Sequence, residues 1–211
     1  MSIAAAISVS ELRDTVYKRF VGETFYVALI NAPATVYTPG TTINGEFLTN
    51  EVGNVGGYVR DTISYDATDI DAYTDEGIPL ARKAATFTHD DSVNTYQFTH
   101  VVLLRTMEVT ASSSGTVLTV ESVGGEYQLS IGTTFVGTGV PAGTYITALG
   151  TGDGSVGTYT LNNTISPALG SDIITAYEIV SVAPLASQAT MSDGNEAVFY
   201  FDLKQFGYYQ V

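Results

Sequence analysis

From Thr106 to Leu203 the chain contains neither lysine nor arginine. Much of this stretch is rich in glycine and threonine, as in GTTFVGTGVPAGTYITALGTGDGSVGTYTLNN, residues 132–163. Such a composition favours short β segments joined by turns over helices. A block of this kind usually extends a surface and does not build a catalytic pocket. It therefore constrains the architecture of the chain more than it constrains any chemistry.

The overall composition excludes several classes of function. The 211 residues include 45% hydrophobic and only 14% charged residues, with a net charge of -14 and no cysteine. Nucleic-acid backbones are bound by lysine and arginine, so we expect no nucleic-acid partner. Without cysteine there is no disulfide or thiolate chemistry. The N-terminus lacks a basic segment before its short apolar stretch, and no apolar run is long enough to span a bilayer, so neither a signal peptide nor a membrane partner is expected.

One helix is expected, at residues 8–21. Ser8 and Glu11 fit a capping box, and Leu12, Val16 and Phe20 recur every four residues as one apolar stripe. This pattern is typical of a helix that packs on a core. An arm that docks on a neighbouring subunit is the alternative.

The rest of the chain is predicted to be β structure. Residues 31–57 read as a loop and residues 66–79 as an acidic loop, while 141–143 and 152–154 read as turns between short hairpins. Strands are expected at residues 25–30, 58–65, 84–88, 95–105, 117–120, 127–131, 145–149, 157–161, 173–182 and 197–203.

The change in composition near residue 106 suggests an insertion. The predicted fold class is all-β: a β-sandwich or barrel-like host domain with an N-terminal helix, residues 1–106 and 173–211. A small Gly/Thr-rich β domain, residues 107–172, would be inserted into it, as loop tips tolerate. The host would bring Thr95–Arg105 close to Ile173–Val182, as paired strands. One continuous sandwich without an inserted unit is the rival prediction.

An acidic run is the first candidate site, because clustered carboxylates are ligands for calcium. Its spacing departs from the EF-hand, since Tyr73 stands where a third ligand is needed, so a solvated loop is the favoured interpretation. The carboxylates are Asp66, Asp69, Asp71, Asp75 and Glu76.

A second cluster has residue types found in hydrolases: His89, Asp90, Asp91, Ser92 and His100. Adjacency in sequence does not specify a triad, and no G-x-S-x-G occurs. Asp90 and Asp91 read as turn formers, and the two histidines are expected at strand edges. A hydrolase would need two carboxylates in a cleft, for which Asp71 with Asp75, or Asp90 with Asp91, are the available pairs.

The segment Gly150–Gly157 has the look of a phosphate-binding loop. It lacks the G-K-[ST] ending, no helix pattern follows, and no basic residue is near, so a β turn is expected. No residue is assigned a catalytic, cofactor-binding or metal-binding role, and no cofactor is expected.

Aromatic residues gather near the C-terminus, at Tyr200, Phe201, Phe206, Tyr208 and Tyr209. Core packing accounts for Phe199, Phe201 and Leu203, whereas Tyr208 and Tyr209 suit subunit contacts, because tyrosine has one apolar and one wet end.

The run VGTGVPAGTYITALGTGDGSVGTYTLNN resembles a Gly/Thr-rich module found in virion proteins of tailed bacteriophages, including cyanophages. The similarity covers roughly residues 115–175. The pieces FYVALINAPA, GGYVRDTISYDA, AATFTH and TAYEIVSVAPLASQATMSDGNEAVFYFDL also resemble a small phage structural protein labelled as tail-fibre or tail-associated. The resemblance implies no catalytic residues.

The resemblance leads us to expect a non-enzymatic structural protein located in the virion. We expect it to be tail-associated, as a fibre, baseplate or adaptor protein that contacts copies of itself and neighbouring virion proteins. Capsid decoration is the close alternative, and a module that binds host surface glycans is a further one.

Overall fold

The computed structural model describes residues 22–33, 44–53, 56–66, 82–125 and 128–201, and the fold is all-β. The predicted helix at 8–21 lies outside these residues. In chain order the elements are β1 (Thr24–Ile30), α2 (Asn44–Leu48), β2 (Asp61–Ser64), β3 (Lys83–Thr88), β4 (Tyr96–Ser114), β5 (Val117–Val123), β6 (Thr134–Val136), β7 (Thr144–Leu149), β8 (Gly157–Leu161), β9 (Gly170–Met191) and β10 (Glu196–Phe201).

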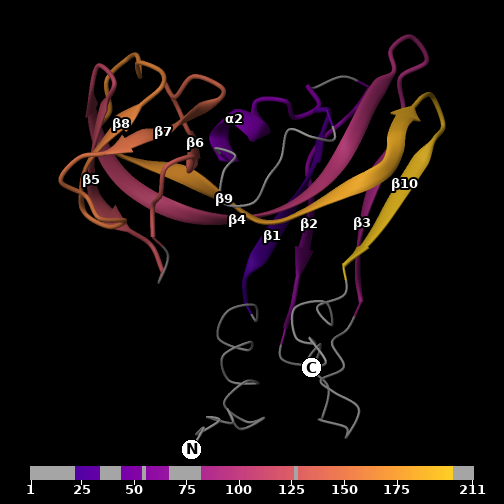
Figure 1. The fold of residues 1–211 in the computed structure, drawn as a ribbon, viewed down its shortest axis with the longest axis horizontal. Coiled ribbons are helices and arrows are strands. Elements are labelled where there is room, and N and C mark those ends of the chain that lie inside the picture. Colours follow the sequence, from indigo (N-terminus) through magenta and orange to yellow (C-terminus); the bar gives the residue numbers. More distant parts are fainter. Residues whose placement is uncertain (1–21, 34–43, 54–55, 67–81, 126–127, 202–211) are drawn as a thin grey trace, which may run out of the picture.

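Two long antiparallel strands, β4 and β9, run through the whole molecule (Figure 1). Their pairing extends from Tyr96 opposite Met191 to Ser112 opposite Gly170, with three irregularities in register. The predicted pairing of residues 95–105 with 173–182 is confirmed, since Leu104 lies opposite Ile179. Both strands are longer than predicted and continue without a break through the change in composition near residue 106.

At one end of these strands the sheet closes on itself and forms what we call the closed lobe. Strands β4, β5, β8, β7, β6 and β9 pair in that order, and β9 pairs back with β4, so this ring has no free edge. Its interior is filled by apolar side chains from every strand, and Tyr159, Phe135 and Ile146 are among the most deeply buried. The predicted turns at 141–143 and 152–154 lie between β6 and β7 and between β7 and β8.

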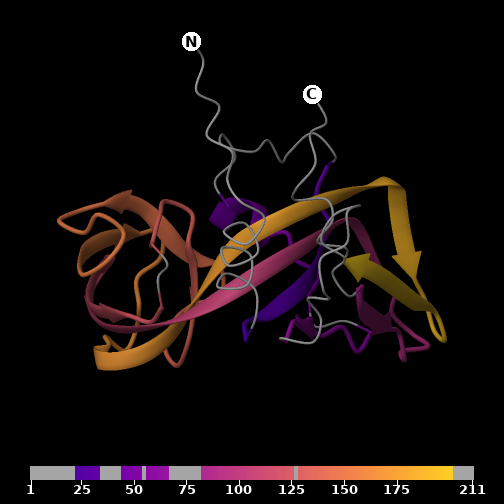
Figure 2. The same ribbon diagram turned by 90° about the horizontal axis from the view of Figure 1, so that it is seen from below.

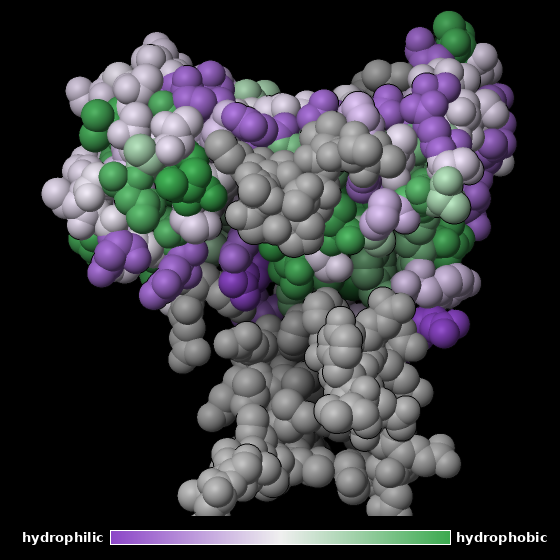
Figure 3. Space-filling view, in the orientation of Figure 1, coloured by the Kyte–Doolittle hydropathy of each residue, from purple (hydrophilic) through white to green (hydrophobic). Residues whose placement is uncertain are grey.

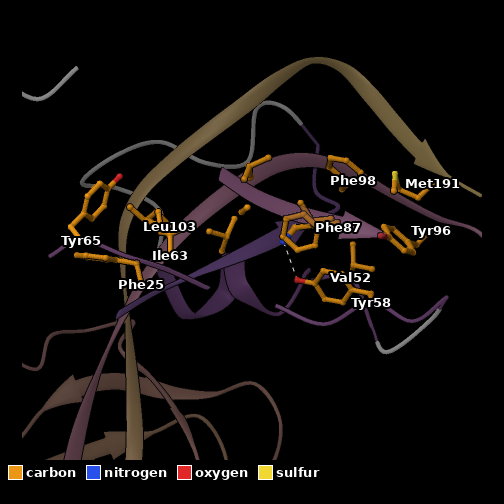
Figure 4. Close-up of a cluster of buried hydrophobic side chains, with 14 residues drawn as sticks. Phe25, Val52, Tyr58, Ile63, Tyr65, Phe87, Tyr96, Phe98, Leu103 and Met191 are labelled. Atoms are coloured by element: carbon orange, nitrogen blue, oxygen red, sulfur yellow. Dashed lines mark hydrogen bonds between the residues drawn. The ribbon is translucent and has the colours of Figure 1, made fainter. Parts of the chain in front are cut away.

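At the other end the same strands belong to a two-layer arrangement, which we call the open lobe. One layer has the strand order β2-β1-β4-β9, and the second consists of β3 and β10. Between the layers lies a cluster of buried side chains in which the ring of Tyr58 stacks on Phe87 at 5.9 Å (Figure 4). Figure 2 shows β10 folding back beneath the end of β9.

The helix α2 packs beside the same sheet, against a third group of buried side chains. This group joins Phe47 and Leu48 of α2 to Ala28 and Ile30 of β1 and to Val102 and Leu104 of β4. The loop predicted for residues 31–57 is therefore wrong at Asn44–Leu48. The five residues of α2 are too few to show a helical period in the sequence.

Two predicted strands differ from the structure. Within 58–65, only Asp61–Ser64 is a strand. Residues 128–131 form no strand. There the N–H of Leu129 bonds to the carbonyl of Gly154 at 2.7 Å, and that of Ser130 to the Thr133 hydroxyl at 3.0 Å, so a loop tucks Leu129 into the core of the closed lobe.

The division into a host domain and an insertion at 107–172 stays a prediction. The buried side chains of β4 join the closed-lobe core from Met107 onward, and those of β9 leave it after Ala176. Because both strands are continuous there, the lobes share backbone and are not joined by a linker.

Candidate functional site at the junction of the two lobes

Tyr145 of β7 in the closed lobe contacts α2 of the open lobe. A Cβ placed on Gly45 would lie 2.2 Å from Cγ of Tyr145, so the absence of a side chain at this helical position lets the ring approach the backbone. The Tyr145 hydroxyl donates to Oε1 of Glu46 at 3.2 Å. Burial, and then the charge of Glu46, raise the pKa of Tyr145. The hydroxyl therefore stays a neutral donor that ties the two lobes together.

Next to this contact is a half-buried ion pair. Nε of Arg60 lies 2.7 Å from Oε1 of Glu51, and Nη2 lies 2.5 Å from Oε2, a two-pronged geometry that suits a guanidinium and a carboxylate. The Tyr58 hydroxyl also donates to Oε1, at 2.9 Å, and accepts the N–H of Leu29 at 3.0 Å. The latter bond is the dashed line in Figure 4. Both carboxylate oxygens of Glu51 are thus occupied.

The guanidinium of Arg60 also makes a cation–π contact with an aromatic ring. Its guanidinium carbon lies 4.4 Å from the ring centre of Tyr177 in β9, and Tyr26 meets that ring edge-on at 5.8 Å. Burial opposes the charge on Arg60, but the hydrogen bonds and charge of Glu51 outweigh it and raise the Arg60 pKa. Burial raises the pKa of Tyr177, while Arg60 acts in the opposite direction. The cation is permanent and compensated locally.

A cavity of about 490 Å³ opens between the lobes beside this ion pair. Its walls come from α2 and the turn after it, from Arg60 and Tyr177, and from the closed lobe. The closed-lobe wall is neutral and its polar groups bond to one another. Oδ1 of Asn162 accepts the N–H of Tyr145 at 2.8 Å, and Nδ2 of Asn162 donates to the backbone carbonyl of Gly143 at 2.9 Å. The polar groups of the closed-lobe wall thus bond within that lobe, while Arg60 and Tyr58 occupy the carboxylate oxygens of Glu51.

The residues proposed for hydrolase chemistry do not come together. His89, directly after β3, is 2% exposed and lies 5.2 Å from the ring of Tyr96, whereas His100 in β4 faces Phe47 at 5.3 Å. Their ring neighbours Tyr96 and Phe47 belong to different core clusters, and both histidines are buried. His100 pairs with β1 on one side and with β9 on the other, so its expected position at a strand edge is wrong.

Asp91 forms the turn that the sequence predicted. Its Oδ1 accepts the N–H of Val93 at 2.8 Å and of Asn94 at 3.2 Å, and its Oδ2 accepts the Asn94 amide at 2.6 Å. Hydrogen bonds from Asn94 and Val93 lower the pKa of Asp91. Asp90 and Ser92 are exposed in the same loop. Asp91 therefore shapes a turn, and neither carboxylate of this pair lines the cavity between the lobes.

The other predicted sites are placed as follows. Of the acidic run, Asp66 is exposed, and Asp69, Asp71, Asp75 and Glu76 lie outside the described residues. In the part of the chain that the structure describes, no three acidic or histidine side chains gather in a way that could hold a metal ion. Of Gly150–Gly157, residues 150–156 form the connection between β7 and β8, as expected for a turn, and Gly157 begins β8.

The C-terminal aromatics divide between core and surface. Phe199 and Phe201 of β10 pack against the open-lobe core, whereas Tyr200 is 64% exposed. Phe206, Tyr208 and Tyr209, together with Leu203, lie outside the described residues.

Sequence reasoning missed Glu51, Arg60 and Tyr177. One signal was present: Arg60 is one of only 8 basic residues in the chain and lies beside an alternating apolar strand pattern. A cation there must find a compensating partner. The identity of that partner depends on folding and was not readable from the sequence.

Comparison with protein-family models, with curated proteins and with solved structures finds no match to this chain. Over the residues described above, no helix is long and apolar enough to cross a membrane.

Proposed function

We propose that this chain is a non-enzymatic structural protein of a tailed-bacteriophage virion, associated with the tail as a fibre, baseplate or adaptor component. It assembles through contacts with its own copies and with neighbouring virion proteins. The observation that carries the proposal is the Gly/Thr-rich stretch that resembles a module of phage virion proteins, which here forms most of the closed lobe on the extended β4–β9 pair.

The construction of the closed lobe supports a contact role. A ring of paired strands has no edge left for uncontrolled pairing, so it can be added to a structural protein without promoting aggregation. Six of the ten exposed large apolar side chains of the described chain lie in this lobe: Val117, Ile131, Val136, Leu149, Val156 and Ile173. Figure 3 shows apolar residues scattered among polar ones over it. Such a surface suits contacts with neighbours.

The internal pairing of the junction also supports a structural role. Glu51, Arg60 and Tyr58 bond to one another and to the backbone, and Tyr145 bonds to Glu46 across the lobes. The Tyr145–Glu46 bond links the two lobes, and the other bonds hold the open-lobe side of the junction in place, as an assembly protein requires of the parts that carry its contact surfaces.

Purified particles of the phage that encodes the chain provide the test. Tails and heads are separated, and the chain is quantified in each fraction by mass spectrometry. We expect it in tail fractions and absent from heads of a tail-less mutant. Copurification with tail-less heads at high copy number would replace the tail assignment by capsid decoration, and absence from all particles would refute the virion role.

A further inference from the structure

His100 lies buried beneath α2, the helix that the closed lobe contacts. It is 1% exposed and occupies a central position in the sheet, opposite Ile30 of β1 on one side and Pro184 of β9 on the other. The ring of Phe47 in α2 packs on the imidazole at 5.3 Å, with an angle of 87° between the ring planes. The helix therefore covers this histidine on that face of the sheet.

One ring nitrogen of His100 is held by the hydroxyl of the preceding residue. Nδ1 lies 2.8 Å from Oγ1 of Thr99. That oxygen accepts the N–H of Ala32 at 3.0 Å and donates to the carbonyl oxygens of Ala32 and Ile30. Because the single hydroxyl proton goes to these carbonyls, the proton between Thr99 and His100 belongs to Nδ1. An additional proton is therefore taken up at Nε2 and gives the buried ring a full positive charge.

The carboxylates on the elements around His100 are already bonded to other groups. Oε1 of Glu46 in α2 accepts the Tyr145 hydroxyl, and the oxygens of Glu51 accept bonds from Arg60 and Tyr58. In the described open-lobe parts of β1, β4 and β9, the other ionisable side chains are Tyr26, Tyr96, Arg105, Tyr177 and Glu178, the last paired with Arg105. An imidazolium at His100 thus finds no free counter-charge on these elements, and burial lowers the pKa of His100.

The helix above His100 is short enough to be displaced. Its five residues form little more than one turn, and a turn of this length is not stable without packing. It is held by burial of Phe47 and Leu48 against the sheet, and by the N–H groups of Asn50 and Glu51, which bond to the carbonyls of Phe47 and Leu48 at 3.1 Å. A charge beneath Phe47 acts directly on this packing.

We propose that His100 and α2 form an acid-sensitive latch: protonation of His100 displaces α2 from the sheet and breaks the contact between the two lobes. Figure 1 shows α2 between the closed lobe and the long sheet. Its displacement breaks the hydrogen bond from Tyr145 to Glu46, separates Gly45 from the Tyr145 ring, and removes one wall of the cavity between the lobes. The strands β4 and β9 still connect the lobes. The latch is a property of the fold and does not depend on the proposed place in a virion.

Proton linkage sets the size of the effect. With α2 displaced, His100 meets water and has its ordinary pKa of 6.5, whereas with α2 in place the pKa is lower. As the pH falls below 6.5, the open state takes up a proton that the closed state does not. The opening equilibrium therefore rises by up to about tenfold for each pH unit until the pKa of the closed state is reached, and by at most about thirtyfold at pH 5.

Amide hydrogen exchange on the full chain at pH 7 and pH 5, corrected for the intrinsic rates, measures this opening. The reporters are the N–H groups of Asn50 and Glu51, which close the turn of α2. Their protection should fall by about tenfold. The N–H of Ile146, which bonds to the carbonyl of Thr133 within the closed lobe, is the internal reference and should change by less than about twofold.

The two histidine rings identify the titrating group. In the wild type, the loss of α2 protection should level off at the pKa that NMR measures for the ring of His100, because below it both states carry the proton. The variant His100→Gln cannot titrate and should show no loss of α2 protection between pH 7 and pH 5. His89→Gln makes the same change at the other buried histidine, beside Tyr96, and should keep the loss.

Three results would overturn the latch. They are protection of α2 that does not change between pH 7 and pH 5, protection that falls equally in His100→Gln, and protection that rises at pH 5 because the Phe47 ring stabilises the imidazolium. If a variant does not fold, the wild type alone decides, since a loss that does not follow the titration of His100 also contradicts the latch. None of these outcomes bears on the presence of the chain in particles, so the two proposals fail separately.

Discussion

At the scale of single residues, the polar groups of the junction are matched to partners from distant parts of the chain. Glu51 and Arg60 lie on the connection between α2 and β2, while Tyr177 comes from β9. Each lies in a partly desolvated place where an unmatched charge is costly. The contribution of the Glu51–Arg60 pair to stability is therefore best measured by removing one charge and leaving its partner in place.

Replacing Glu51 by glutamine should destabilise the fold by about 2 kcal/mol. The change leaves Arg60, whose side chain is 23% exposed, without a counter-charge. Urea unfolding followed by circular dichroism measures the loss. Glu108→Gln makes the same chemical change on an exposed position of β4 and should be nearly neutral. Equal stability of the two variants would show that the ion pair contributes nothing.

His100 should make stability depend on pH. Burial lowers its pKa below the ordinary 6.5, so as pH falls through 6.5 the unfolded chain takes up a proton that the folded chain does not. The contribution of His100 to the free energy of unfolding is therefore complete above pH 6.5. It is lost as the pH falls from 6.5 towards the lower pKa of the folded state. Between pH 7 and pH 5 the free energy of unfolding should change less steeply with pH in His100→Gln than in the wild type, whatever the absolute stability of the variant. An unchanged slope would contradict this origin.

At the scale of elements, α2 packs against the closed lobe where a glycine and an aromatic ring meet. Alanine at a helical position normally stabilises relative to glycine by about 1 kcal/mol. At Gly45 alanine should instead destabilise the fold, because the added Cβ overlaps the ring of Tyr145. We expect Gly45→Ala to cost about 2 kcal/mol by overpacking.

A double-mutant cycle isolates that contact. Tyr145→Ala removes the ring, so the cost of Gly45→Ala should largely vanish in the Tyr145→Ala background. Gly53→Ala is the matched control, because nothing lies within 4 Å of a Cβ at that position. Additive losses of stability in the cycle would mean that a Cβ at position 45 does not clash with the ring of Tyr145.

The elements also show what the sequence could predict. Short runs of apolar and strand-favouring residues were enough to place β1, β3, β5, β7 and β8, because that signal is local. The length of β4 and β9 was underestimated, since a strand continues wherever its backbone finds a partner, and composition does not report partners. Closure of the ring through β6 and β9, and the approach of Glu51 to Arg60 beside Tyr177, depend on long-range pairing. No local pattern encodes them.

At the scale of the whole molecule, the question is whether the open lobe depends on the closed one. The buried side chains of the two lobes form separate clusters. On β4 the two open-lobe clusters end at Leu103 and Leu104, and the closed-lobe cluster starts at Met107. The lobes share two strands, the contact of α2 with Tyr145, and the neighbourhood of the cavity. The separate cores suggest that the open lobe can fold without the closed lobe, whereas the shared strands suggest that the two lobes fold together. Deleting the closed lobe distinguishes these possibilities.

Replacing residues 108–175 by Asn-Gly should leave a folded open lobe. Met107 and Ala176 are opposite each other in the β4–β9 ladder, so a two-residue turn joins them as a hairpin without changing the register. We expect a cooperative urea transition and a β-type circular dichroism spectrum, with a smaller denaturant slope because less surface becomes exposed. Extending the deletion by one residue, to 176, is the control: it sets Met107 opposite Tyr177 and turns every following side chain to the wrong face. Folding of both variants would mean that the ladder does not specify register. Failure of the first would mean that the closed lobe is part of the folding unit, so that the Gly/Thr-rich stretch is not an addition to an independent domain.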